Sequence, residues 1–526
     1  MIKIKQQLLF LLGILALFGL AIFILTEPLI DDVSLFPDMF FPFSFSAHSY
    51  SRILIFGLAL SGALGLLFGL TRSDFKEQLL GFLAIISALG LTLANDFRTL
   101  FFFWELVTIS SSALVLLHGK ASKWVFNRGM RFFFMHLLGG LLLLFGILLH
   151  YAETGSVALG LPQGGMIFFI LGFGIKTAFI PLHLWIAWGY PAASIYSAVI
   201  LASLTTKVGL YAVARVLPPL DFIVYMGITM AVAGAGFAMM QTKMRELLSY
   251  SIISQVGYMV AGAAIGSTLA VDGALLHAVN HLVYKALFFM CAACVIHATG
   301  VEELSNANKG DIGQGQLQKP VWKLYPVALA GAVIASLSVL GIPPMSGYVS
   351  KTLLKEALYG YELMAVALSI AGVGTVIVFC RFIYLGFFKN HVSTVSRPSF
   401  FMNFAIVLAS LASIILGIYP QILAPLLPHG TSLAVYSVTG LIDAVKIAII
   451  GVLIYVFTNK YLERIIPYIN RLSIERLFLN PLISQSYMVF KLIGKRESDF
   501  TRNMGDDQAL MFLMLLAFLF IIFLGA

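Results

Sequence analysis

The sequence is a succession of long apolar runs, and this feature restricts the fold more than any other. About 17–25 apolar residues suffice to cross the ~30 Å hydrocarbon core of a bilayer as a helix. Backbone groups in lipid must hydrogen-bond within their own segment, so such runs are expected to be helical. The predicted fold is therefore an all-α polytopic membrane protein of about 14–15 transmembrane helices. The fifteen candidate runs are 7–26, 52–71, 79–94, 99–118, 132–150, 165–188, 192–215, 222–241, 247–266, 272–298, 324–358, 362–386, 400–423, 440–458 and 508–525.

The composition excludes several classes of protein. Of the 526 residues, 60% are apolar and only 11% are charged. A soluble domain carries roughly 25% charged residues, so this chain has too few charges to cover a water-exposed surface. A soluble enzyme, a disordered chain and a nucleic-acid binder are all disfavoured. The net charge of +9 is attributed to basic loops on the cytoplasmic side of a membrane.

The basic residues predict the orientation of the chain. They gather in alternate loops, beginning with Lys3 and Lys5 and continuing with Arg72 and Lys76, whereas acidic residues such as Asp38 follow the first run. Cytoplasmic loops of membrane proteins carry the excess of Lys and Arg. We therefore predict a multi-pass protein of the cell (inner) membrane with a cytoplasmic N-terminus and an outer C-terminus. The first run lacks a small-residue cleavage site and is expected to remain as an anchor.

Two of the runs contain prolines near their middle, Pro181 in one and Pro343 with Pro344 in the other. Five runs separate equivalent points, so the two stretches would have opposite orientations in the membrane. Interrupted helices in two inverted halves are typical of a transport site, although proline also kinks helices without any such role. A lysine near each break favours the transport interpretation. The organisation predicted is 1–94 N-terminal helices, 95–241 first repeat, 242–390 second inverted repeat and 391–458 C-terminal helices.

The last part of the chain differs from the rest. Residues 459–507 are basic and amphipathic, and a final apolar anchor follows at 508–526. We interpret 459–507 as a lateral helix that lies along the membrane face, with a cytoplasmic linker as an equal alternative.

Five ionisable residues lie well inside apolar runs: Glu105, Lys176, Lys207, Lys285 and Lys351. A charge at the centre of a bilayer costs at least ~2.5–3.5 kcal/mol, so these residues require a function or a partner. We expect Glu105 and Lys176 to interact, because opposite charges keep each other ionised. An attraction that can be made and broken is a proton switch. The alternative is a static ion pair that only fixes helix packing.

A row of basic side chains follows one helix face. His277, His281 and Lys285 recur at intervals of four residues and therefore line the same side of a helix. Two imidazoles and an amine in lipid suggest a proton relay. A zinc site is the rival, but no carboxylate or cysteine shares that face, and the lysine would repel a cation. Neither a metal nor a cofactor is therefore expected, and the phosphate-loop-like letters around Lys176 lack the glycine before the lysine.

At this point the sequence resembles a known family. Five stretches occur in order: Trp104-Glu105-Leu106, Gly174-Ile-Lys176 through Pro181-Leu-His183, the stretch from Leu204 to Tyr211 with Lys207, His277 to Lys285, and Gly341-Ile-Pro-Pro through Lys351. They resemble the antiporter-like subunits shared by respiratory complex I (NADH:quinone oxidoreductase), energy-converting hydrogenases and Mrp-type cation/proton antiporters.

The resemblance implies roles for these residues. Glu105 resembles the family's essential glutamate, and Lys176 and Lys207 resemble the lysines at and after the first broken helix. Lys285 resembles the central lysine and Lys351 the terminal one. Protons would step along Lys176, Lys207, the histidines, Lys285 and Lys351.

These observations lead to one hypothesis and three alternatives. The chain is expected to be a proton-translocating subunit of a redox-driven membrane complex, with sodium coupling left open. It would carry no redox chemistry of its own, and its partners would be other membrane subunits and peripheral redox subunits. The alternatives are an Mrp-type Na+/H+ antiporter subunit, a non-conducting scaffold, and a self-sufficient transporter of a small solute.

Overall fold

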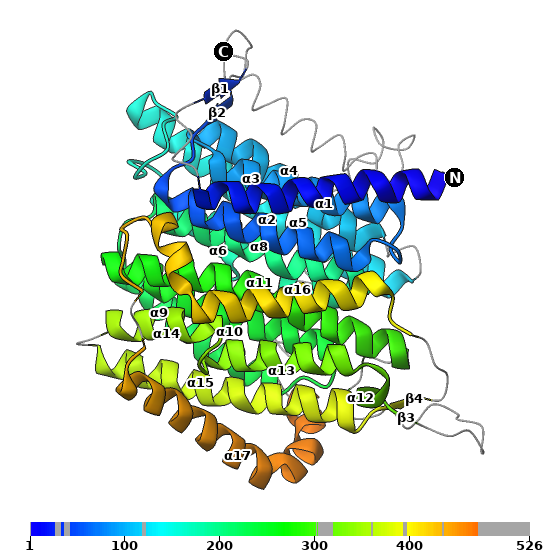
Figure 1. Ribbon diagram of the computed structural model, residues 1–526. Helices are drawn as coiled ribbons and strands as arrows, with labels where there is room; N and C mark the ends of the chain where they lie inside the picture. The colour runs from blue at the N-terminus through cyan, green and yellow to red at the C-terminus, as the bar shows by residue number, and fades with distance from the viewer. Residues whose placement is uncertain are drawn as a thin grey trace.

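The computed structural model describes residues 2–26, 33–35, 43–117, 122–300, 302, 304, 319–358, 361–392, 397–433 and 436–471. Its long helices run side by side through the molecule (Figure 1). In chain order the first half contains α1 (Ile2–Thr26), α2 (Ser49–Gly69), α3 (Phe75–Leu93), α4 (Phe97–Leu117), α5 (Lys123–Thr154), α6 (Met166–Thr177), α7 (Leu184–Ala192), α8 (Ile195–Val216) and α9 (Asp221–Met239).

The second half has the same character. It contains α10 (Met244–Ile265), α11 (Thr268–Thr299), α12 (Val321–Leu324), α13 (Pro326–Leu340), α14 (Ser346–Ala357), α15 (Glu362–Ile383), the π-helix η2 (Tyr384–Phe388), α16 (Phe400–Ile418), the 3-10 helix η3 (Pro420–Leu426) and α17 (Val438–Arg471). Two short antiparallel pairs join β1 (Val33–Leu35) to β2 (Phe43–Phe45) and β3 (Lys319–Pro320) to β4 (His391–Val392).

The predicted membrane spans are confirmed over the described residues. Twelve helices there are long and apolar enough to cross a bilayer. The two remaining runs, 165–188 and 324–358, are each made of shorter helices, α6 with α7 and α12 to α14. The fifteenth run, 508–525, and most of the predicted lateral segment lie outside the described residues. The helix predicted to end at 458 continues to Arg471, so the first residues of the 459–507 segment extend α17.

Both predicted helix breaks are present. α6 ends at Thr177, Pro181 lies in the connection, and α7 begins at Leu184. α13 ends at Leu340, and Pro343 and Pro344 precede α14. Proline lacks the backbone N–H that a helix interior requires, so each helix stops and a new one starts inside the span. The break leaves some backbone carbonyls at mid-span without the partner that a continuous helix would give them.

The helices differ sharply in burial. Nearly all residues of α2, α8, α10 and α11 are buried, whereas few residues of α1 and α17 are buried. Figure 1 accordingly has α8 and α11 in the middle of the molecule and α1 and α17 at opposite edges. Because the exposed helices are also apolar, their outer faces suit contact with lipid. The side chains of α8 and α11 are thereby shielded from both lipid and water.

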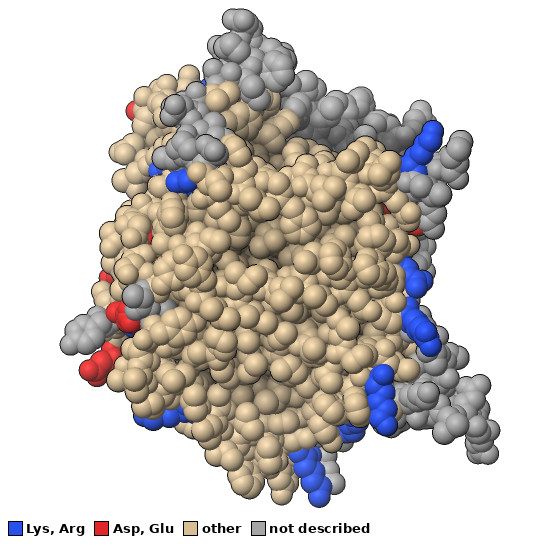
Figure 2. Space-filling view, in the orientation of Figure 1, with Lys and Arg blue, Asp and Glu red and all other residues tan. Residues whose placement is uncertain are grey.

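Charged side chains avoid the broad face of the molecule. Figure 2 shows a wide uncharged band, with most of the Lys and Arg side chains along the right-hand edge, where the N-terminus lies, and the Asp and Glu side chains mainly on the left. The band runs across the helices, as expected for a surface that faces hydrocarbon.

One polar contact fastens the connection before α17 to α11. The carboxylate of Asp272, which is fully buried, accepts hydrogen bonds from the backbone N and ring Nδ1 of His429 at 3.2 and 2.9 Å. It also accepts bonds from the backbone N and the hydroxyl of Thr431 at 3.1 and 2.6 Å. Four donors on one carboxylate satisfy a buried charge that would otherwise be costly.

Candidate functional site

Lys176 is the last-but-one residue of α6, immediately before the first break, and is 1% exposed. Its ammonium donates hydrogen bonds to Thr108 Oγ1 at 2.8 Å and to the carbonyl oxygen of Trp104 at 3.2 Å, both on α4. It also lies 4.6 Å from the centre of the Trp104 ring. Hydroxyl, carbonyl and aromatic face all favour a cation without neutralising it. These contacts would stabilise a proton on Lys176, and none of them is an ion pair.

Glu105 follows Trp104 on α4, and its carboxylate lies against Gly140 of α5, where a methyl group would overlap Glu105 Oε1. Oε1 is buried and has no hydrogen-bond partner among the described residues. Glu105 and Lys176 lie close enough to interact electrostatically, but no ion pair within 4.0 Å joins them in this part of the chain. The expected interaction is thus long-range, and Thr108 and Trp104 make the direct contacts with the lysine.

At the first break, a carbonyl that accepts from the backbone N of Ala178 also accepts from a tryptophan. Trp185 Nε1 on α7 donates to Ile175 O of α6 at 2.7 Å. The neighbouring helix α8 approaches the same place closely, because a Cβ at Gly209 would lie only 2.9 Å from the backbone N of Thr177. The lack of a side chain at Gly209 is what allows α8 to reach the end of α6.

Lys207 lies on α8 two residues before Gly209 and is fully buried. Its ammonium donates to Ala202 O of the same helix at 2.9 Å. Lys207 is also within electrostatic reach of His281 and Lys285 on α11. α8 therefore connects the group around Lys176 with the group on α11.

The predicted face of α11 is present and completely buried. His277, His281 and Lys285 are all 0% exposed, and the two imidazole centres are 6.5 Å apart. His277 Nδ1 is 2.9 Å from Ser350 Oγ of α14. Lys285 donates to Ser251 Oγ of α10. Neither ring nitrogen of His281 has a hydrogen-bond partner among the described residues, so this imidazole is the unpaired centre of the row.

Lys351 lies on α14 just after the second break. Its ammonium donates to Val339 O at 2.6 Å, and it lies 5.0 Å from the centre of the Tyr258 ring. Val339 is the last-but-one residue of α13, so its carbonyl is one of those that the helix end leaves without a partner. A side chain thus donates to a carbonyl near the helix end at both breaks, Trp185 at the first and Lys351 at the second.

Together these seven residues form a row through the middle of the molecule. Glu105 and Lys351 at its ends are partly exposed, and Lys176, Lys207, His277, His281 and Lys285 between them are buried. Figure 1 has α4 and α14 on opposite sides of α8 and α11. The row therefore runs across the bundle from one side toward the other.

Sequence reasoning missed several members of the site. Thr108, Ser251 and Ser350 hold the amines and an imidazole of the row, and His136 of α5 lies near Lys176. The sequence does place these hydroxyls and this histidine inside apolar runs. Polar groups in lipid usually have a partner, so their position could have indicated that they contact the buried charges.

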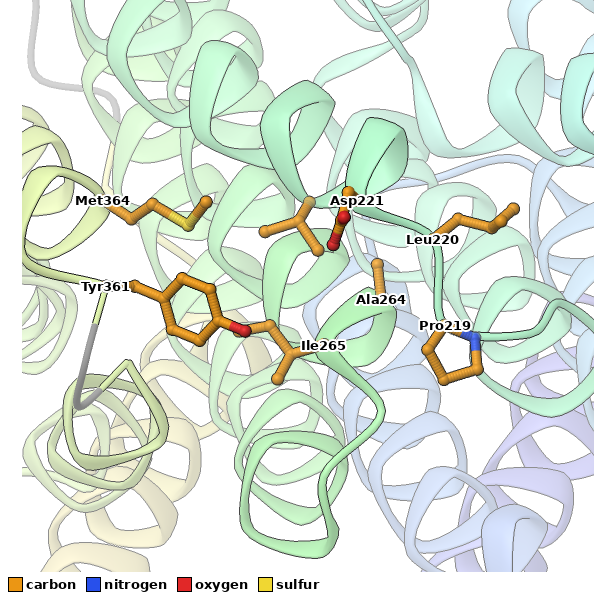
Figure 3. Close-up of a pocket in the computed structure, with 8 residues that line it drawn as sticks. Pro219, Leu220, Asp221, Ala264, Ile265, Tyr361 and Met364 are labelled. Atoms are coloured by element: carbon orange, nitrogen blue, oxygen red, sulfur yellow. The ribbon is translucent and has the colours of Figure 1, made fainter.

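The cavity in Figure 3 is separate from this row. It has a volume of about 250 Å³ and lies at the ends of α9, α10 and α15, where Asp221 and Tyr361 face it. None of the residues of the row lines it. Over the described residues, no three His, Cys, Asp or Glu side chains are grouped as metal ligands, and Cys291 and Cys294 are buried free thiols.

The comparison with protein families decides the identity. The family described as "NADH:quinone oxidoreductase/Mrp antiporter, TM" matches residues 94–378, which hold every residue of the row. The chain belongs to this family. Within it, the chain is 30% identical over 309 residues to a Na(+)/H(+) antiporter subunit of Alkalihalophilus pseudofirmus, covering 53% of this chain and 59% of that one.

Other members of the family are about as similar. An NADH-quinone oxidoreductase subunit of Desulforudis audaxviator is 30% identical over 295 residues, covering 51% of this chain and 56% of that one. Hydrogenase-4 component B of Escherichia coli is 26% identical over 324 residues, covering 55% and 46%. The chain therefore matches only about half the length of these family members.

The fold recurs in solved complexes. A chain of the Mrp complex from Dietzia sp. DQ12-45-1b superposes with a TM-score of 0.77 at 20% identity over 96% of this chain and 58% of that one. A chain of the membrane-bound sulfane sulfur reductase, an archaeal respiratory membrane complex, gives a TM-score of 0.76 at 20% identity over 99% and 96%. The fold shared with these two chains thus extends beyond residues 94–378.

Proposed function

We propose that this chain is a proton-translocating subunit of a multi-subunit, redox-driven membrane complex of the complex I or membrane-bound hydrogenase type. The observation that carries the proposal is the row of buried basic groups from Lys176 to Lys351. Three buried lysines with only neutral hydrogen-bond partners are costly for stability, which argues for their retention as carriers of a proton.

The mechanism follows from the geometry of the row. A proton that arrives near Glu105 is passed to Lys176, then to Lys207 beside the first break, and then to the histidines and Lys285 on α11. It leaves through Lys351 at the second break. Hydroxyls such as Thr108 and Ser251 donate or accept as required, so they stabilise both the neutral and the charged amine. Each step moves one proton between two adjacent basic groups and leaves the total number of protons unchanged.

The membrane orientation belongs to this proposal. The N-terminus is cytoplasmic, and the predicted outer C-terminus follows from the final run. The redox reaction takes place in peripheral partner subunits, since the row contains no group that exchanges electrons. The transported ion is the proton, with sodium coupling left to experiment.

Removal of one buried amine tests the proposal. In vesicles containing the intact complex, Lys176→Met should abolish proton movement while the complex still assembles. Lys446→Met is the matched control, since Lys446 is an exposed lysine on α17 and lies outside the row. Normal proton movement in the Lys176→Met complex would refute the path and favour a non-conducting scaffold.

The second candidate is a subunit of an Mrp-type Na+/H+ antiporter. It is supported by the similarity to the Alkalihalophilus antiporter protein and by the fold of the Dietzia complex. Purification of the chain from its native membrane in mild detergent, with mass spectrometry of its partners, separates the two. Iron–sulfur, flavin or hydrogenase-like subunits support the redox-driven complex. A set of small hydrophobic subunits alone supports the antiporter.

A further inference from the structure

Two helices of the proposed inverted repeats share their length and both of their caps. α5 and α11 are both 32 residues long and are the second helix of their repeats. Each begins after a serine N-cap, Ser122 or Ser267, whose side chain accepts from the backbone N three residues later. Each ends at a left-handed glycine, Gly155 or Gly300. The offset is 267 − 122 = 145 at the start and 300 − 155 = 145 at the end, so the two helices align without a gap.

This alignment assigns a counterpart to the central histidine of the row. Adding 145 to 136 gives 281, so His136 occupies in the first repeat the position of His281 in the second. His136 is likewise 0% exposed. Its ring lies 4.4 Å from the Trp185 ring, edge to face, and 4.3 Å from the Phe132 ring. A buried imidazole at the same place in both repeats indicates a shared role rather than an accident of packing.

The contacts of His136 fix which nitrogen can take up a proton. Nδ1 is 3.0 Å from the carbonyl oxygen of Phe132, and a carbonyl only accepts, so Nδ1 carries the hydrogen and donates. Nε2 of the neutral ring therefore holds the lone pair. This atom is buried and has no hydrogen-bond partner among the described residues. It is free to accept a proton without breaking the bond that orients the ring.

Two charged groups of the first half of the row come from the helices packed against α5. Gly140, against which the Glu105 carboxylate lies, is one helical turn along α5 from His136. Positions four apart on a helix are neighbours, about 6 Å apart along the axis. From α6, Lys176 is within electrostatic reach of His136. α4 thus supplies an acid, α6 supplies a base, and α7 supplies only the uncharged Trp185.

We propose that His136 is a third proton-binding site of the group formed with Glu105 and Lys176, and the counterpart of His281 in the first repeat. The inference rests on the proposed function and adds a residue to it. The Glu105 carboxyl gives its proton to His136 Nε2, which leaves a carboxylate and an imidazolium. The imidazolium then gives this proton to neutral Lys176, which restores the imidazole and leaves an ammonium.

The test replaces the imidazole and keeps its orienting bond. In His136→Asn the amide can still donate to Phe132 O but cannot take up a proton, and His136→Gln serves if that variant does not fold. His150→Asn is the matched control, because His150 lies on the same helix and its Nδ1 accepts from the backbone of Gln163 instead. Two quantities are measured: proton movement by the complex in vesicles, and the pH titration of the Glu105 carboxyl by infrared spectroscopy, assigned with Glu105→Gln.

We expect His136→Asn to slow proton movement about 100-fold and to move the midpoint of the Glu105 titration by about one pH unit, with both unchanged in His150→Asn. Slower movement with an unchanged midpoint would overturn the inference, because it indicates a structural role. No change in either quantity would overturn it as well. If the wild-type complex moved no protons but the midpoint still shifted, the proposed function would fail while the coupling of His136 to Glu105 would stand.

Discussion

The position of the Glu105 carboxylate depends on the missing side chain of Gly140, and Gly140→Ala tests this directly. The added methyl would overlap Glu105 Oε1, whereas ordinary contact begins at 3.4 Å, so the carboxylate would have to move by well over an ångström. A displacement of ~1 Å in a reacting group costs about 100-fold in rate. This corresponds to about 2.7 kcal/mol in the barrier to proton transfer. We expect proton movement to fall by that factor.

The same substitution should not destabilise the helix. Alanine is favoured over glycine in a helix interior by about 1 kcal/mol, so α5 should remain folded. Gly236→Ala on α9 is the control, because no atom lies within 4 Å of a Cβ built there. It receives the same gain in helix propensity without meeting a neighbour. Proton movement in vesicles, normalised to the amount of assembled complex, is the assay for both variants.

A double-mutant cycle isolates the contact. Glu105→Asp shortens the side chain by one methylene and withdraws the carboxylate by about 1.5 Å, which leaves room for the methyl. In that background Gly140→Ala should therefore cost little, so that the two changes are strongly non-additive. Additive losses, or normal activity of Gly140→Ala alone, would refute the argument that Gly140 positions Glu105.

Two further predictions concern other contacts of the structure. Thr108→Val keeps the shape of the side chain but removes one of the two acceptors of Lys176, and a hydrogen bond to a charged group contributes about 1.5–3 kcal/mol. Proton movement should slow by about 10- to 100-fold, and an unchanged rate would show that Trp104 O alone suffices. Asp272→Asn removes the charge that holds His429 and Thr431 and should lower stability by about 2–4 kcal/mol, seen as a lower melting temperature in detergent. The rate per folded complex should stay unchanged, and a lost rate at full stability would contradict a purely structural role.

The overall fold could be predicted from the sequence because lipid restricts the choices so strongly. A run of apolar residues in a bilayer has little alternative to a helix, so the run 132–150 correctly located α5. The breaks were also indicated, since Pro181, Pro343 and Pro344 lack the N–H that a helix interior uses, although Pro191 lies within α7. The apolar runs did not, however, predict the residues at which the helices begin and end. α5 begins at Lys123, well before the apolar run, because Ser122 caps it and a helix can extend into the polar layer.

The partners of the buried charges were harder to predict, because they depend on tertiary packing. Thr108 is 68 residues from Lys176, and Ser350 is 73 residues from His277. Nothing in local periodicity indicates which of many hydroxyls faces a given amine. The same holds for the long-range relation between Glu105 and Lys176: their residue types suggested an ion pair, but the packing of α4 on α6 gives the lysine a hydroxyl and a carbonyl instead. Electrostatic complementarity predicts that two groups interact, and helix packing decides whether they touch.

The alignment of α5 with α11 also explains how two similar helices come to differ in chemistry. The same offset relates Gly140 to Lys285, since 140 + 145 = 285. Where the second repeat has an amine, the first has a gap, and the Glu105 carboxylate from α4 lies against it. The histidine one turn away is common to both helices. Each histidine is thus one helical turn from a different ionisable group, a carboxyl in the first repeat and an amine in the second. Under the proposed function the two halves differ in the groups that take up a proton, while the direction of flow comes from the energy that a partner subunit supplies. This difference is what a partner subunit would need to act on in order to drive protons along the row.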